Sequence, residues 1–199
     1  VTFTATNGNI SFTDTSDTIE TSGGSIVMSA GGTLSVGAMR TNGGDITLAG
    51  TDFNLSGALN AGVGTLTILG GSGETIGLDG TTASTTASTV STICNGTACG
   101  LTLVQSELSD ISAGKLVIGD SSSGKMYIDG VTLSHISGGV TLNSSGSSGS
   151  VEFGTGGATI KLATINAGNG ITINGDVSVA QSAIFNVDYD ANGTGQFII

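Results

Sequence analysis

Two cysteines, Cys94 and Cys99, have the clearest chemistry in this sequence. They flank the short turn 95–98, so a disulfide between them is favoured if the chain is exported to an oxidising compartment. Free thiols and a metal site are the alternatives, but zinc would need two further soft or imidazole ligands. The one histidine of the chain lies far away in the sequence. The spacing therefore predicts a disulfide, worth about 2 kcal/mol by loop entropy.

His135 is the single imidazole of the chain, so any Ser-His-Asp scheme would have to use it. The segment LSHIS, which begins at Leu133, aligns with LSDIS, which begins at Leu108. The alignment places His135 where the other copy has Asp110, between two apolar residues. This pattern indicates an exposed turn rather than a catalytic histidine.

Two stretches approach the spacing of calcium ligands. Residues 70–78 (GGSGETIGL) are similar to a nonapeptide calcium repeat, but a threonine replaces the required aspartate and no second copy stacks on it. Asp188, Asp190 and Asn192 occupy positions 1, 3 and 5 of a calcium loop, whereas Ile199 falls where a bidentate glutamate is needed. We expect an Asx-type turn, with calcium as the alternative, and we expect no cofactor.

Charge and composition exclude several functional classes. The chain has 15 Asp and Glu against 4 Lys and Arg, a net charge of -11, so it offers no basic surface for nucleic acid or anionic membranes. We therefore expect neither nucleic-acid binding nor membrane insertion. A mean hydropathy of +0.32 with 35 Gly and no Pro also excludes simple disorder and collagen.

Short repeated strands must position these residues. The pattern Gly-x-aliphatic-x-apolar begins at Gly8, Gly24, Gly44 and Gly64, with the last three copies 20 residues apart. It returns at Gly114, Gly138 and Asn169. A second alternating strand follows most copies, with apolar pairs at Leu34 and Val36, Phe53 and Leu55, Ile76 and Leu78, Met126 and Ile128, Val151 and Phe153, and Val177 and Val179.

The alternation gives each strand one buried and one wet face. A period of about 20 residues is too short for its own core, but stacked copies bury a continuous aliphatic column, with Ile46, Leu48, Leu66 and Ile68 pointing inward. The sequence therefore predicts an all-β parallel β-helix (β-solenoid) of nine or ten coils, as a single domain over residues 1–199. A sandwich of antiparallel hairpins is the alternative, and it would show tight turns and more aromatic core residues.

The regularity fails after Asp79. Residues 81–92 (TTASTTASTVST) predict an irregular Ser/Thr-rich excursion at about residues 80–100, either a solvated loop or an extra pair of strands. O-linked sugar on these hydroxyls is the alternative.

The stretch 108–131 (LSDISAGKLVIGDSSSGKMYIDGV) resembles repeats of the filamentous haemagglutinin-like exoproteins, which are bacterial surface adhesins of the two-partner secretion type. The resemblance implies a right-handed β-helix outside a Gram-negative cell, and this hand agrees with the crossover rule. The chain lacks the Asn-Pro signature of the family's secretion domain, so we expect a piece of the repeat shaft. Seven residues carry the match: Leu108, Ile111, Ala113, Gly114, Leu116, Ile118 and Gly119.

We therefore expect a structural or adhesive shaft on the bacterial surface, with no catalytic residues. Its expected partners are more of the same polypeptide or another copy packed head to tail, together with a host or cell-surface glycan or protein receptor. The first rival is an ice-binding or glycan-binding solenoid, which would show Thr ranks or aromatic shelves. The predicted rank of outward residues at the central strand position is Ser11, Val27, Thr47, Thr67, Val117, Thr141 and Thr172. The second rival is a polysaccharide-degrading enzyme, which would need clustered carboxylates beside cations; the four cations, however, are scattered over several coils.

Overall fold

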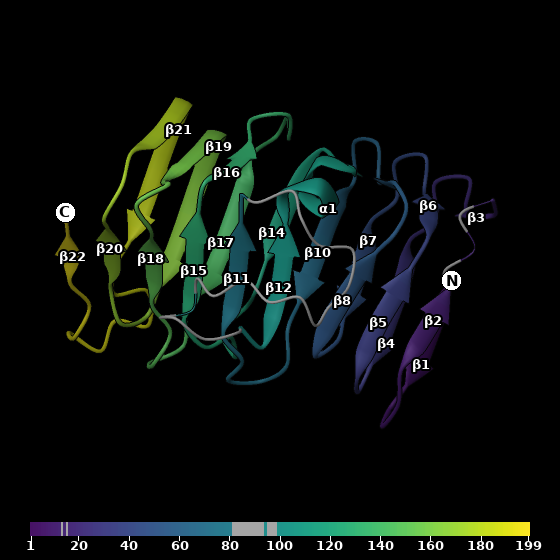
Figure 1. Cartoon of the computed structure of the whole chain (residues 1–199), viewed down its shortest axis with the longest axis horizontal. Helices are drawn as coiled ribbons and strands as arrows, with labels where there is room; N and C mark the ends of the chain where they lie inside the picture. Colours follow the sequence, from purple (N-terminus) through teal and green to yellow (C-terminus); the bar gives the residue numbers. More distant parts are fainter. Residues whose placement is uncertain (13, 15, 81–93, 95–98) are drawn as a thin grey trace.

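The chain folds into a stack of parallel strands that is elongated along one axis (Figure 1). The computed structural model describes residues 1–199 except 13, 15, 81–93 and 95–98. It is a nearly all-β solenoid of about eight turns, spaced roughly 23 residues apart, with the two termini at opposite ends. The prediction of a parallel β-solenoid is confirmed.

Four parallel sheets form the walls of the stack. The long sheet contains β1 (Thr2–Ala5), β4 (Ile26–Ala30), β7 (Ile46–Ala49), β10 (Thr65–Leu69), β14 (Lys115–Ile118), β17 (Val140–Ser144), β19 (Ala158–Ala167), β16 (Val131–Leu133) and β21 (Val177–Asn186). The six-stranded sheet contains β12 (Leu101–Val104), β11 (Ile76–Asp79), β15 (Met126–Asp129), β18 (Val151–Phe153), β20 (Ile171–Ile173) and β22 (Phe197–Ile198). The three-stranded sheet contains β2 (Ile10–Phe12), β5 (Thr33–Val36) and β8 (Asp52–Leu55), and the four-stranded sheet contains β13 (Ile111–Ser112), β9 (Leu59–Asn60), β6 (Ala38–Arg40) and β3 (Thr18–Glu20).

An aliphatic column runs through the stack. Ile46 pairs with Leu66, and Leu48 pairs with Ile68, in the register of β7 and β10. All four side chains are fully buried, as predicted. Burial of each such side chain stabilises the fold by about 1.5–3 kcal/mol. One row of this column consists of Ile26, Ile46, Leu66, Leu116, Val140 and Ala163.

Glycine is required where neighbouring coils touch at a corner. A side chain at Gly114 would place its Cβ 2.2 Å from the carbonyl oxygen of Val63, and one at Gly138 would lie 2.2 Å from the carbonyl oxygen of Gly114. Backbone contacts this close exclude any Cβ. The strand motif therefore begins with glycine at these corners.

The predicted repeat of about 20 residues per coil agrees with the observed spacing of roughly 23 residues, but the prediction of nine or ten coils overestimates the number of turns. The step is 20 residues between β4, β7 and β10, but Leu66 of β10 pairs with Leu116 of β14, which lies far along the chain. The intervening chain forms β11, β12, α1 (Gln105–Ser109) and β13. Because this additional passage lengthens one repeat, the chain makes about eight turns rather than nine or ten.

The additional passage changes the order of the strands. β11 pairs with β12 on one side and with β15 on the other, and β12 also contacts β8. The spatial order is therefore β8, β12, β11, β15, although β11 precedes β12 in the chain. Most of the predicted excursion at about residues 80–100 lies outside the described residues.

Two predicted copies of the strand motif belong to other walls. Residues 10–12 form β2 and pair with β5, whereas the long sheet takes β1 at that level. Residues 171–173 form β20 of the six-stranded sheet, and the long sheet takes β19 and β21 there. The strand-level pattern is the same on every wall, so it could not tell one wall from another.

Candidate functional site

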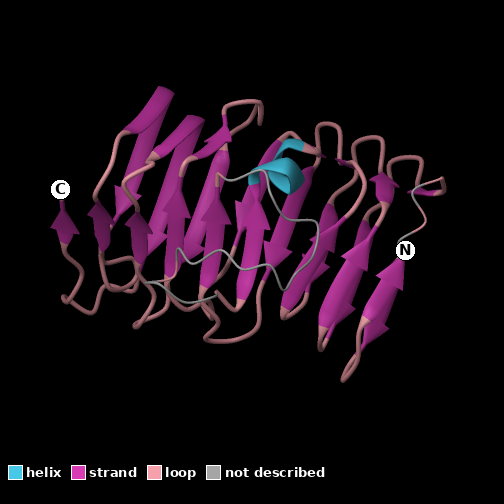
Figure 2. Ribbon diagram, viewed as in Figure 1, coloured by secondary structure: helices cyan, strands magenta, loops and turns pink. Residues whose placement is uncertain are grey.

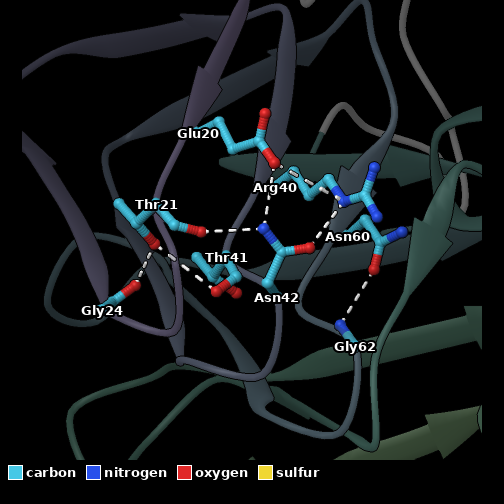
Figure 3. Close-up of polar contacts among 8 residues, drawn as sticks. All are labelled: Glu20, Thr21, Gly24, Arg40, Thr41, Asn42, Asn60 and Gly62. Atoms are coloured by element: carbon cyan, nitrogen blue, oxygen red, sulfur yellow. Dashed lines mark hydrogen bonds and ion pairs between the residues drawn. The ribbon is translucent and has the colours of Figure 1, made fainter.

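A ladder of polar contacts ties the first coils together at one corner (Figure 3). The side-chain nitrogen of Asn42 donates to Oε1 of Glu20 at 2.9 Å and to the backbone carbonyl of Thr21 at 3.0 Å. The side-chain oxygen of Asn42 accepts from Nε of Arg40 at 2.8 Å. Arg40 and Glu20 are 3.9 Å apart and both more than half exposed, so their ion pair contributes little. The ladder is a structural link between coils.

The same corner repeats a hydroxyl contact. The side chain of Thr21 donates to the carbonyl of Gly24, and one coil later the buried Thr41 donates to the carbonyl of Gly44. One coil further along, Oδ1 of Asn60 accepts the backbone amide of Gly62 at 2.9 Å. These contacts satisfy turn groups that would otherwise be unpaired.

Cys94 and Cys99 are joined by a disulfide bond, with their Cα atoms 5.3 Å apart. Cys94 is buried. Residues 95–98 lie outside the described residues. The disulfide lies within the additional passage between β10 and β14.

His135 lies in an exposed turn between the buried Leu133 and Ile136, where the alignment with Asp110 predicted it. Asp110 is likewise exposed, at the end of α1. The structure therefore places both copies at the same kind of turn.

The calcium-like turn is held by its own backbone. Asp188 accepts from the amide of Asn192 at 3.1 Å and from that of Gly193 at 3.0 Å, one bond to each carboxylate oxygen. The side chain of Asn192 donates to Oδ2 of Asp190 at 2.7 Å. Oδ1 of Asn192 also accepts the amide of Thr194, two residues ahead, at 2.9 Å, which is the geometry of an Asx-type turn. Within the described ranges no group of three or more His, Cys, Asp or Glu could hold a metal ion.

The outer face of the six-stranded sheet gathers charged and aromatic groups that the sequence did not connect. Nζ of Lys125 donates to Oε2 of Glu152 at 2.6 Å and lies 4.4 Å from the centre of the Tyr127 ring. Asn174 donates to the other oxygen of Glu152 at 3.1 Å. Burial lowers the pKa of Lys125, but its contacts with Glu152 and Tyr127 outweigh burial and raise the pKa. We call Lys125, Tyr127, Glu152 and Asn174 the charged cluster.

A hollow of about 260 Å³ adjoins the charged cluster. Its volume is slightly below the range typical of small-molecule pockets. Together the hollow and the cluster offer hydrogen-bond donors, acceptors and one aromatic ring on successive coils. The partners in the charged cluster lie about one coil apart in the sequence, at separations of 27 and 22 residues. This spacing points to a contact only when the register of the coils is known. Polar residues that line the hollow include Lys125, Ser150, Asn169, Thr172, Thr194 and Gln196.

The long sheet corrects the rank of outward residues predicted from the sequence. Ser11 and Thr172 belong to other walls, and Thr2 and Thr164 take their places. The rank is broken by Val27, Val117 and Ile184, so it does not offer the regular Thr rows expected of an ice-binding face. The full rank is Thr2, Val27, Thr47, Thr67, Val117, Thr141, Thr164 and Ile184.

No protein-family model, curated protein or solved structure matches this chain. The β-solenoid is compatible with β-helix repeat proteins in general. Across the described residues, none of the helical segments has the length and apolar character needed to cross a membrane.

Proposed function

We propose that this chain is a structural or adhesive shaft segment of an extracellular bacterial surface protein, similar to filamentous haemagglutinin-like exoproteins. The observation that carries the proposal is the aliphatic column, which continues through the stack to coils whose apolar side chains are exposed. A column of this kind is extended by adding coils, as in other solenoids. The proposal includes no catalytic step.

The last coil supports end-to-end contact. The rings of Phe185 and Phe197 pack with their centres 5.6 Å apart, yet Phe197 is 45% exposed and Ile198 51% exposed. In the described part of the chain β21 pairs with β19 alone. Such an edge offers unpaired backbone groups beside apolar side chains, which template another strand.

The opposite end has the same character. Phe3 on β1 is 39% exposed, and β1 pairs with β4 alone among the described strands. A contact between the two ends would be heterologous, so copies would extend into a filament unless rotation closed a ring. The net charge of -11 disfavours sideways contacts. Either another copy or more of the same polypeptide would cover these edges.

The adhesive role would use the charged cluster and its hollow. A tyrosine ring beside a lysine, a carboxylate and an amide is a set of groups that can stack on and hydrogen-bond a sugar ring. We therefore propose that this face holds the binding site for a glycan receptor. Binding to a glycan array by the wild type, lost on Tyr127→Ala and Glu152→Gln but kept on Thr159→Ala, would support this placement; binding unchanged in all three variants would contradict it.

Association of the ends is tested with one added charge. Ala183 on β21 pairs with the buried Ala163 and is itself exposed, so Ala183→Lys puts a lysine on the open edge. Thr159→Lys adds the same charge at an exposed position one coil further in. In a concentration series by analytical ultracentrifugation we expect larger species for the wild type and for Thr159→Lys, but not for Ala183→Lys.

A wild type that stays monomeric at millimolar concentration would exclude self-assembly. More of the same polypeptide would then be the remaining way to cover the exposed edges of β1 and β21. The surface location is tested separately, by immunogold microscopy of intact cells with an antibody to this segment. Label confined to the cell interior would overturn the proposed function.

A further inference from the structure

Two carboxylates replace strand pairing where two sheets of the solenoid follow one another along the stack. The three-stranded sheet ends at β8 and the six-stranded sheet begins at β12, and no ladder joins these neighbours within the part of the chain that the structure describes. Instead, Oε1 of Glu107 accepts the amide of Leu55 on β8 at 3.0 Å. Oε2 of the same carboxylate accepts the amide of Val104 on β12, also at 3.0 Å. We call this contact the β8–β12 joint.

Asp52 forms a second bridge across the joint. Its carboxylate accepts the amide of its neighbour Phe53 at 2.9 Å on β8 and also the amide of Thr102 on β12. Each bridge therefore supplies acceptors to amides on both strands, which is the role that backbone carbonyls play in a regular sheet. The joint depends on two side chains that can be protonated.

The surroundings of Glu107 disfavour its charge. The side chain is buried, and the residue as a whole is 8% exposed. The charges that act on it are those of two acidic groups, Asp110 at the end of α1 and Asp52 on β8. A third acidic residue, Asp79 on β11, pairs in register with Val104. The charge of Glu74 also acts on Asp52 and raises its pKa. The ranges of β12, β13 and β16, which pack against α1, contain no titratable side chain.

Burial raises the pKa of Glu107 to about 7, and the charges of Asp52 and Asp110 add to the rise, although the amides of Val104 and Leu55 oppose it. Burial likewise raises the pKa of Asp52. A carboxyl whose folded pKa lies above its unfolded value binds protons preferentially in the folded state. Its contribution to stability is therefore present in mild acid and is lost as the pH rises from about 4.5 to about 7.

We propose that the β8–β12 joint is a proton-dependent contact, which protonation of Glu107 tightens and which ionisation of Glu107 loosens. Protonation removes a buried charge at the cost of one weaker amide contact, because one oxygen becomes a hydroxyl. The long sheet passes the joint without interruption through β7, β10 and β14. Loosening is therefore a local opening of β8, β12 and α1 and not a separation of the stack. This is a property of the fold, independent of the function proposed above.

The direct test is made on the wild type. The side-chain carboxyl carbon of Glu107 is followed by carbon NMR between pH 4 and pH 9. We expect a midpoint near pH 7. A midpoint at the ordinary value near 4.5 would overturn the proposal. The measurement uses the wild type, so it does not depend on the folding of a variant.

The mechanical consequence is tested by hydrogen exchange detected by mass spectrometry, expressed as protection factors so that intrinsic rates cancel. Protection of peptides from β8, β12 and α1 should fall by roughly tens of fold between pH 5 and pH 8. Peptides from β17 should change far less. Glu107→Gln should remove most of the difference and leave only the part that belongs to Asp52, whereas Asp176→Asn, which removes one exposed carboxylate, should keep it. A pH dependence in Glu107→Gln equal to that of the wild type would refute the joint.

Discussion

The side-chain amide of Gln105 forms two hydrogen bonds to the main chain of Thr132, as a residue of a neighbouring strand would. Its Nε2 donates to the carbonyl of Thr132 at 3.0 Å, and its Oε1 accepts the Thr132 amide at 2.7 Å. Gln105 is the first residue of α1, and Thr132 is the middle residue of β16. β16 pairs with β19 on its other side, so the amide caps the edge that a strand would otherwise cover. Figure 2 shows α1 as a short helical turn set among the strands.

We predict that Gln105 acts through this pairing. Gln105→Ala should lower the free energy of unfolding by about 1 kcal/mol, because two hydrogen bonds are lost at a partly wet site. Gln105→Glu should cost at least as much, since a carboxylate cannot donate to the Thr132 carbonyl. Urea unfolding measures both, with the exposed Gln181→Ala as the control. Equal midpoints for Gln105→Ala and Gln181→Ala would contradict the prediction.

The aliphatic column should not tolerate charge. Ile46 is fully buried and pairs with Ile26 and Leu66, so Ile46→Asp places an unpaired carboxylate in the core at a cost of several kcal/mol. Thr47→Asp puts the same group on the outer face of the same strand and should change stability by less than about 1 kcal/mol. Thermal unfolding followed by circular dichroism compares the two. If Ile46→Asp melts with the wild type, the register described above is wrong.

The disulfide should be present in protein isolated from outside the cell. Intact mass after alkylation should show no modified cysteine before reduction and two after it, because the chain contains no other thiol. Cys94→Ser combined with Cys99→Ser should lower stability by about 2 kcal/mol. Alkylation of both cysteines without reductant would exclude the bond.

Calcium should not stabilise the turn at Asp188. Ile199 stands where a calcium loop needs its bidentate glutamate, and both carboxylate oxygens of Asp188 already accept backbone amides, so the turn lacks the ligand set of a calcium site. Melting temperatures in millimolar calcium and in chelator should agree, with magnesium as the control for ionic strength. A rise specific to calcium would show that the turn rearranges into a metal site.

The sequence by itself determined the local architecture. Alternating residues such as Ile46 and Leu48 face inward because a strand has a period of two, and a repeat of about 20 residues cannot bury them without its neighbours. The exposed turn at His135 also followed from its position between apolar residues. These features depend on properties of the chain within one coil, which the pattern records directly.

Only the tertiary structure decided which strands are neighbours. Every wall uses the same short alternating strand, so the sequence could not assign residues 10–12 or 171–173 to a wall, nor place β12 between β8 and β11. The charged cluster and the joint at Glu107 depend on that choice: Glu107 binds Leu55 across 52 residues, and Lys125 binds Glu152 across 27. Stacking is a long-range choice fixed by packing and by the pairing of buried amides, and a pattern with one period carries no record of it.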